Sequence, residues 1–182
     1  AYLNTINLDA KHEKAWFNLG LVYHKSNNLK KALDCYNKAL ALNPSYVDAL
    51  NNKGNVLKSQ GQLEGAYKCY SDAATIKPSA IVYYNIGLVL QLMSRPHDAV
   101  DAFICAVKYQ PDYSDAWTGL GFAFHKTKNY AQAVDAYKKS LTFKPDNAVV
   151  WNGLGITYKK LKMLEPAIEC FARAVDIKPD YS

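Results

Sequence analysis

Five prolines divide the chain into units of nearly constant length. Successive prolines are separated by 34, 33, 34 and 34 residues, and they are Pro44, Pro78, Pro111, Pro145 and Pro179. A fixed period of this size is the signature of a fold built by stacking one structural unit. We expect units at 13–46, 47–79, 80–113, 114–147 and 148–182. A unit alone cannot bury its apolar face, so all five are expected to form one domain.

The same kinds of side chain return at the same place in each unit. The fourth place holds a large residue, with Trp16, Leu50, Tyr83, Trp117 and Trp151. The eighth place is always glycine, and the twenty-fourth is always aromatic, with Tyr36, Tyr70, Phe103, Tyr137 and Phe171. In the first unit, apolar or small residues at 16, 19, 20 and 23 fall on one face of a helix.

Proline and turn residues indicate where the helices end. Each proline pushes the preceding residue out of the α region, so it should end the second helix of its unit. Asn27 and Gly61 tolerate a left-handed backbone, and we expect them at the turn between the two helices. Asp112 and Asp146 are candidate N-caps of the next helix. Each unit is therefore predicted to be a helical hairpin, and the chain to be all-α.

This pattern closely resembles the tetratricopeptide repeat family, whose motif W-x2-L-G-x2-Y, A-x3-F and P spans 34 residues. The resemblance covers residues 13–182 and implies an α-solenoid, a right-handed superhelix of about five hairpins. Residues 1–12 align with the end of a preceding repeat, which favours a fragment of a longer array. The turn after Pro78 is one residue short, and we expect a local change in the superhelix there.

Composition argues against several functional classes. The net charge of +6 is spread without a block of like charges, and most of the fourteen tyrosines fall at core places, so no nucleic-acid binding is expected. The four cysteines form no CxxC pair, and no metal or cofactor is expected. The sequence shows neither a signal peptide nor a membrane-length apolar run, and we expect no membrane association and a cytoplasmic location.

Candidate catalytic motifs have simpler structural explanations. Gly119 and Gly121 superficially match part of a dinucleotide loop, but they lie within helical periodicity. His24 and His125 share a place in units too far apart to hold one metal ion. Asp112 and Asp115 are interpreted as turn and cap residues. We therefore predict a protein that is not an enzyme.

The resemblance implies that the first helix of each unit lines a concave face, where relatives bind partner segments. The sixth place on this face holds Asn18, Asn52, Asn85, Gly119 and Gly153. The asparagines are similar to those in the repeat arrays of O-GlcNAc transferase and peroxisomal import receptors. A side-chain amide offers a donor and an acceptor, and so matches one peptide unit of a bound strand. The ladder could instead be ordinary solvated helix surface.

Other inward places complete the predicted peptide site. Its remaining members are Phe17, Asn51, Asn55, Tyr84, Leu88, Phe122, Lys126, Asn152, Ile156 and Lys159. Bulky apolar groups without a covering helix indicate a binding site, and the lysines favour an acidic partner. Gly119 and Gly153 should leave room beside Phe122 and Ile156. The cation cluster with which chaperone-binding relatives clamp a carboxylate is not matched here.

The leading hypothesis is a non-catalytic scaffold that binds an extended or helical peptide segment of a partner protein in its concave groove. Two alternatives remain open. The chain could self-associate, by stacking of its ends or by docking of residues 1–12 on another copy. It could also be the substrate-recognition arm of a larger enzyme, such as a glycosyltransferase.

Overall fold

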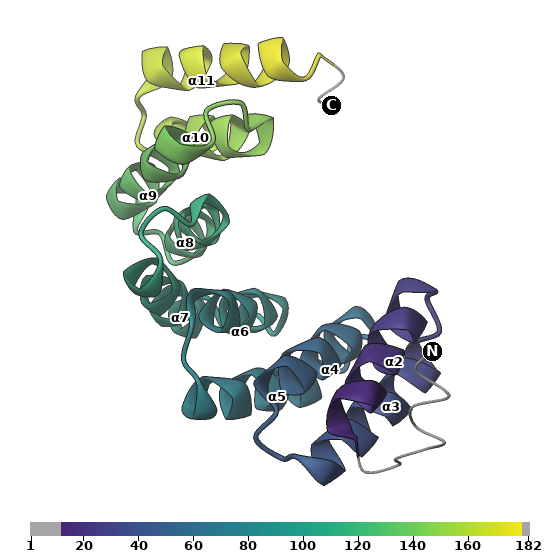
Figure 1. The fold of residues 1–182 in the computed structure, drawn as a ribbon. Helices are drawn as coiled ribbons and strands as arrows, with labels where there is room; N and C mark the ends of the chain where they lie inside the picture. Colours follow the sequence, from purple (N-terminus) through teal and green to yellow (C-terminus); the bar gives the residue numbers. More distant parts are fainter. Residues whose placement is uncertain (1–11, 180–182) are drawn as a thin grey trace. The chain divides into compact units, whose positions relative to one another are not determined.

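The computed structural model describes residues 12–179, which form ten α-helices and no strand. The helices follow one another as pairs (Figure 1). Their bounds are α2 (Glu13–Lys25), α3 (Leu29–Leu42), α4 (Val47–Ser59), α5 (Leu63–Ile76), α6 (Ala80–Leu92), α7 (Pro96–Tyr109), α8 (Ser114–Lys126), α9 (Tyr130–Phe143), α10 (Ala148–Lys160) and α11 (Leu164–Ile177). The predicted all-α hairpin fold is confirmed.

The chain divides into two compact units after Val82. In the first, α2 packs against α3, α3 against α4, and α4 against α5. In the second, α7 packs against α8, α8 against α9, α9 against α10, and α10 against α11. Within each unit, these helices bury a face against their neighbours in sequence, as expected for an array of helical hairpins.

The core of each hairpin is an aromatic ring packed against a glycine of the first helix. Tyr36, Tyr70 and Phe103 are completely buried, each with its ring beside the eighth-place glycine of its own unit. A Cβ built on Gly54 would lie only 2.6 Å from Cε1 of Tyr70. Interiors are packed at crystal-like density, so a ring this close leaves no room for a larger residue. This contact explains why the eighth place is always glycine.

The turns confirm the predicted use of left-handed backbone and extend it. Asn27 has φ 57° and Gly61 has φ 74°, as expected. Ser94, Lys128 and Lys162 occupy the same turn with φ between 58° and 64°. A left-handed conformation is unfavourable for lysine, so the hairpin geometry overrides local preference at these positions.

The helix ends near each proline also follow the prediction. Asn43, Lys77 and Gln110 precede their prolines in extended conformations and cap α3, α5 and α7. Trp117 and Trp151 then donate their indole N–H groups to the carbonyls of Pro111 and Pro145, at 2.8 and 2.7 Å. These bonds tie the start of a first helix to the turn before it.

The predicted aspartate N-caps are wrong. Tyr113 is the N-cap residue of α8 and makes no side-chain cap bond, and Asn147 is the N-cap of α10. The Oδ1 atom of Asn147 accepts from the backbone N–H groups of Val149 and Val150. The helices begin one residue later than predicted, so Asp112 and Asp146 remain in the turns.

The prediction for residues 1–12 falls almost entirely outside the described residues. His12 alone is described, as the N-cap of α2, where its Nδ1 atom accepts from the N–H of Ala15 at 3.3 Å. After Pro78, α6 begins at Ala80, whereas α4, α8 and α10 begin three residues after their prolines. The effect of this short turn on the superhelix stays a prediction.

Candidate functional site

A hollow of about 300 Å³ lies between α6 and α8. Its lining residues are Tyr84, Leu88 and Gln91 of α6, Asp115, Thr118, Gly119 and Phe122 of α8, and Asn147 before α10. We call this the α6–α8 hollow. Three of its members, Tyr84, Leu88 and Phe122, are among the peptide-binding residues predicted from the sequence. The structure therefore brings part of the predicted site together.

The apolar part of the hollow comes from residues one helical turn apart. Tyr84 and Leu88 are four residues apart on α6, and Phe122 projects from α8. The Tyr84 ring is held in place by Tyr113, at 5.1 Å between ring centroids, and by Phe103 at 6.0 Å. Phe122 remains 44% exposed, with the Nζ atom of Lys126 5.2 Å from its ring centroid. A large ring this exposed beside a hollow is available to a ligand.

The polar part contains one carboxylate and two amides. Asp115 accepts a hydrogen bond at 2.8 Å from Lys144, and both side chains are about half exposed. Gln91 uses its Nε2 atom to donate to the carbonyl of Gly119 at 3.1 Å, which joins α6 to α8. Asn147 has its Oδ1 atom engaged in capping α10. The amides therefore present their remaining polar atoms in fixed orientations.

Two tyrosines near Asp115 are kept in the neutral form. Burial and the Asp115 carboxylate raise the pKa of Tyr84. Burial, Tyr84 and Asp115 raise the pKa of Tyr113 to about 12. Both phenols therefore keep their protons at neutral pH and can donate hydrogen bonds. Asp115 is the one carboxylic acid among the residues that line the hollow.

Sequence reasoning missed Gln91 and Asn147 and misjudged Asp115. Asp115 lies in the first turn of α8, but it is not a cap residue as predicted. Gln91 occupies the same place of the repeat as Lys159, which was predicted to be part of the peptide site, so the repeat register could have identified it. No signal in the sequence could place Asn147, because it belongs to a turn and reaches the hollow only through tertiary packing.

The glycines at the sixth place pack against aromatic rings. A Cβ on Gly119 would lie 2.6 Å from Cε1 of Phe103, and one on Gly153 would lie 3.1 Å from Cζ of Tyr137. Each glycine thus lets the preceding unit's ring approach closely. Gly119 also lines the hollow with Phe122, but the Phe103 ring fills the place of its missing side chain. The glycine therefore does not itself provide the room predicted beside Phe122.

The predicted asparagines differ in their surroundings. Asn18 and Asn51 are half-buried on α2 and α4, and Asn85 is 6% exposed. Asn52 donates from Nδ2 to the carbonyl of Asp48, one turn earlier, at 2.8 Å. Asn55 accepts from the hydroxyl of Tyr70 at 2.7 Å. Asn52 and Asn55 therefore each use part of their side-chain amide for hydrogen bonds within the protein.

The remaining predicted residues lie outside the hollow. Phe17 packs against Tyr46, at 5.0 Å between ring centroids, and against Tyr36 at 6.0 Å. On α10, Ile156 is exposed and Asn152 is half-buried. The predicted lysines Lys126 and Lys159 are both exposed, near the ends of α8 and α10.

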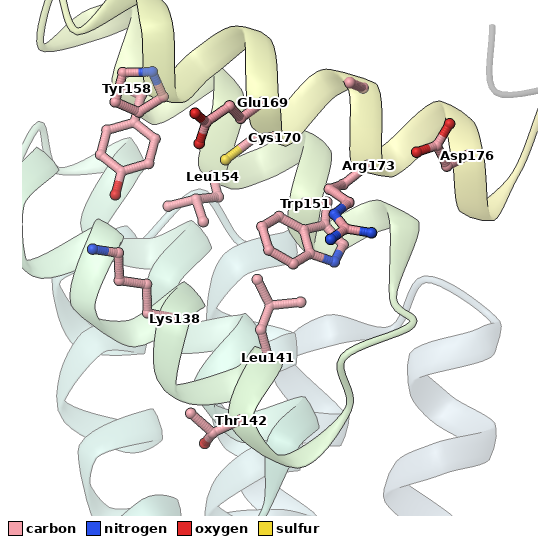
Figure 2. Close-up of a pocket in the computed structure, with 12 residues that line it drawn as sticks. Lys138, Leu141, Thr142, Trp151, Leu154, Tyr158, Glu169, Cys170, Arg173 and Asp176 are labelled. Atoms are coloured by element: carbon pink, nitrogen blue, oxygen red, sulfur yellow. The ribbon is translucent and has the colours of Figure 1, made fainter.

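A larger hollow of about 980 Å³ is lined by α10 and by α9 and α11, the second helices of the last two units. Figure 2 shows Leu154 of α10 between Lys138 of α9 and Glu169 of α11, and Trp151 of α10 between Leu141 and Arg173. Tyr158 raises the pKa of Lys138, mainly through a hydrogen bond. None of the predicted site residues lines this hollow.

The reactive side chains of the described residues do not gather into a metal site. Among residues 12–179, no three His, Cys, Asp or Glu side chains lie close enough together to hold a metal ion. Burial raises the pKa of the thiols of Cys35, Cys69 and Cys170, which makes them poor nucleophiles. No described helix combines the length and apolarity needed to cross a lipid bilayer.

Comparisons with solved structures establish a shared fold. YrrB, described as a tetratricopeptide repeat protein with an unusual peptide-binding site, is 24% identical with a TM-score of 0.86, over 100% of this chain and 94% of YrrB. PilF of Pseudomonas aeruginosa is 22% identical with a TM-score of 0.86, over 98% and 82% of the two chains. MamA of Desulfovibrio magneticus RS-1 is 17% identical with a TM-score of 0.86, over 93% and 97%. No curated protein is a significant match.

Family models place the chain among known repeats. One tetratricopeptide repeat model matches residues 13–46, 114–147 and 148–181, which is more than half of the chain. Two further models of the same repeat match 35–68 and 54–94. Together with the hairpin fold and the glycine–aromatic core, these matches show that the chain belongs to the tetratricopeptide repeat family.

Proposed function

We propose that this chain is a protein-interaction module that binds a peptide segment of a partner protein, and that the α6–α8 hollow accepts one side chain of that segment. The observation that carries the proposal is the exposed ring of Phe122 beside Tyr84 and Leu88 in a hollow of about 300 Å³. Binding sites combine such apolar surface with a few fixed polar groups, here supplied by Gln91 and Asp115.

Within residues 83–182, we propose that the remaining contacts with the peptide come from α8 and α10, the first helices of their units. Exposed Ile156 offers a second apolar contact, and Asn152 offers an amide for the peptide backbone. Exposed Lys126 and Lys159 favour acidic residues in the flanks of the segment. In residues 12–82, the half-buried Asn18 and Asn52 are proposed to contact peptide backbone in the same way.

YrrB supports this assignment as an analogy, because its description names a peptide-binding site on the same fold. A fold does not by itself choose a function, so the hollow in this chain carries the argument. The role is proposed to be binding without catalysis. The Thr118 hydroxyl in the hollow donates to the Ser114 carbonyl at 3.1 Å, and Asp115 is paired with Lys144. Three buried free thiols fit a reducing compartment, and we propose the cytoplasm.

Peptide selection with a matched pair of variants tests the proposal. A displayed library of random peptides is selected on the chain, and the enriched peptides are measured against Phe122→Ala and Phe143→Ala. The two rings are 44% and 41% exposed, but Phe143 lies at the end of α9, outside the hollow. Loss of the apolar contact at Phe122 should weaken binding about tenfold.

Phe143→Ala should bind the selected peptides as the unchanged chain does. Failure to enrich any peptide, or equal losses in both variants, would contradict the proposed site. Circular dichroism of both variants confirms that neither has lost its helices.

A further inference from the structure

We infer that the α6–α8 hollow is specific for an arginine side chain of the partner peptide. The inference rests on the proposed function, since it assigns a ligand to the same site. Three properties of the hollow lead to it: the sign of its charge, the polar atoms left available, and the aromatic rings that line it.

The charge of the lining residues is negative. Asp115 carries the one charge among the eight residues that line the hollow. It faces Tyr84 closely enough for its carboxylate to raise the pKa of that phenol. A peptide carboxylate would be repelled here, whereas a cation would be attracted, and the attraction strengthens where the surroundings exclude water.

The polar atoms left available in the hollow are mainly acceptors. Gln91 has its Nε2 atom bonded to Gly119, so its carbonyl Oε1 atom remains for a ligand. Asp115 receives Lys144 on Oδ1, which leaves Oδ2. A guanidinium group has five N–H donors and no acceptor, and so fits a carboxylate and an amide carbonyl together. Asn147 has its Oδ1 atom engaged, so its Nδ2 atom is left to donate to a peptide carbonyl.

The rings of Tyr84 and Phe122 suit arginine better than lysine. A guanidinium is planar and weakly hydrated, and it stacks on aromatic faces while its edge binds a carboxylate. The Phe122 ring already has the ammonium of Lys126 at 5.2 Å from its centroid, which shows that this ring is reachable by a cation. The aliphatic stem of arginine would contact Leu88.

Lys144 already binds Asp115, so an arginine ligand must displace its ammonium group or share the carboxylate with it. Both side chains of this ion pair are exposed to solvent, to 55% for Lys144 and 44% for Asp115. Pairs of this kind contribute little to stability, so an incoming guanidinium loses little by replacing the ammonium. Removing the lysine charge should therefore strengthen arginine binding, and this outcome separates the inference from a purely apolar site.

The test uses N-acetyl-arginine methylamide as the probe and N-acetyl-citrulline methylamide as its uncharged control of the same shape. Both are titrated into the ¹⁵N-labelled chain, and the amide signals of Gly119, Phe122 and Gln91 are followed by NMR. We expect saturable shifts at these three amides with the arginine compound. Citrulline should bind about tenfold more weakly, which corresponds to about 1.4 kcal/mol.

Three variants test whether the charge of Asp115 gives the preference for arginine. Asp115→Asn should remove the preference for arginine over citrulline, and Lys144→Gln should increase arginine affinity. Asp112→Asn is the matched control, because Asp112 is an exposed aspartate in the turn before α8 and does not line the hollow. It should leave the preference unchanged. The ¹⁵N spectrum of each variant shows directly whether it is folded.

The inference is overturned if the arginine compound gives no saturable shift at these amides, if citrulline binds equally well, or if Asp115→Asn keeps the preference. Failure here is distinguishable from failure of the proposed function. Selected peptides that depend on Phe122 but lack arginine would leave the peptide site intact and refute its specificity for arginine. Enrichment of no peptide at all would refute the site itself.

Discussion

The aromatic ring at the twenty-fourth place explains most of the repeat pattern at the scale of single residues. Phe103 lies between Gly87 of its own unit and Gly119 of the next, and a Cβ on either glycine would come within 2.6 Å of the ring. The ring therefore fills the space that two missing side chains leave. The sequence periodicity predicts the ring and the glycine at the eighth place. The glycine at the sixth place of the next unit, Gly119, depends on how the next helix packs.

Gly119→Ala is expected to destabilise the chain more than Gly153→Ala. The two glycines share the sixth place, but the nearest ring atom is 2.6 Å from the added Cβ at 119 and 3.1 Å at 153. Overpacking of a core costs about 1–3 kcal/mol, and the gain in helix propensity from glycine to alanine returns about 1 kcal/mol. We therefore expect a net loss at 119 and nearly unchanged stability at 153.

Urea unfolding followed by tryptophan fluorescence measures both changes. The double variant Gly119→Ala with Phe103→Leu should lose less stability than the sum of the two single losses, because the smaller leucine side chain makes room for the new methyl group. Equal unfolding free energies for the two single variants would show that the ring contact does not decide the residue at the sixth place.

At the scale of helices, neighbouring first helices are joined by side chains as well as by packing. His125 of α8 lies with its Nδ1 atom 2.9 Å from the hydroxyl oxygen of Thr157 of α10. The Thr157 hydroxyl donates to the Gly153 carbonyl at 2.7 Å, so the imidazole N–H is the donor to Thr157. Burial, Lys126 and Lys160 lower the pKa of His125, which favours the neutral ring in the folded chain.

This histidine should make the stability of the chain dependent on pH in the acidic range. Its folded pKa lies below the ordinary value of 6.5, so the unfolded chain binds the proton more readily. The free energy of unfolding should therefore fall as the pH decreases below about 6.5 towards the folded pKa. Above that range, both states hold a neutral ring and the contribution of His125 is constant.

The His125→Gln variant isolates this effect. Unfolding free energies of both proteins are measured between neutral and mildly acidic pH, and the difference between the two curves is attributed to the histidine. The unchanged chain should lose more stability on acidification than the variant. Parallel curves would mean that His125 has the same pKa in the folded and unfolded chain.

On the scale of the whole molecule, α11 presents an apolar face without a helix of the described residues covering it. Leu164, Ile168 and Val175 are all more than half exposed. At matching places of α9, Val134 and Leu141 are buried, because α10 packs on that helix. The same kind of face on α11 should accept a helix, and a second copy of the chain is one source of it.

Sedimentation equilibrium over a range of concentrations tests this self-association. We expect the average mass to rise with concentration, and Ile168→Lys to reduce the rise, because it places a charge in the apolar contact. Val149→Lys is the control, since Val149 is similarly exposed but lies on α10. The melting temperature should hardly change, because Ile168 is 67% exposed. A monomer at every concentration would refute self-association.

The repeat, the helical hairpins and the core aromatic residues can all be predicted from the amino-acid sequence. These features follow from local rules: proline ends a helix, an aromatic ring at a constant place is buried, and apolar residues recur at helical spacing. The left-handed turns at Asn27 and Gly61 followed from residue type alone. Such rules fail at Lys128 and Lys162, where the hairpin imposes a conformation that lysine does not favour.

Which side chains share a site depends on how helices from different units pack together. The hydrogen bond from Gln91 to Gly119 joins residues 28 apart in sequence, and that from Lys144 to Asp115 joins residues 29 apart. Periodicity shows which face of a helix a residue occupies, but not how far neighbouring helices lie from one another. That separation is set by the ring of Phe103 against Gly119, and so the shape and charge of the α6–α8 hollow follow from packing.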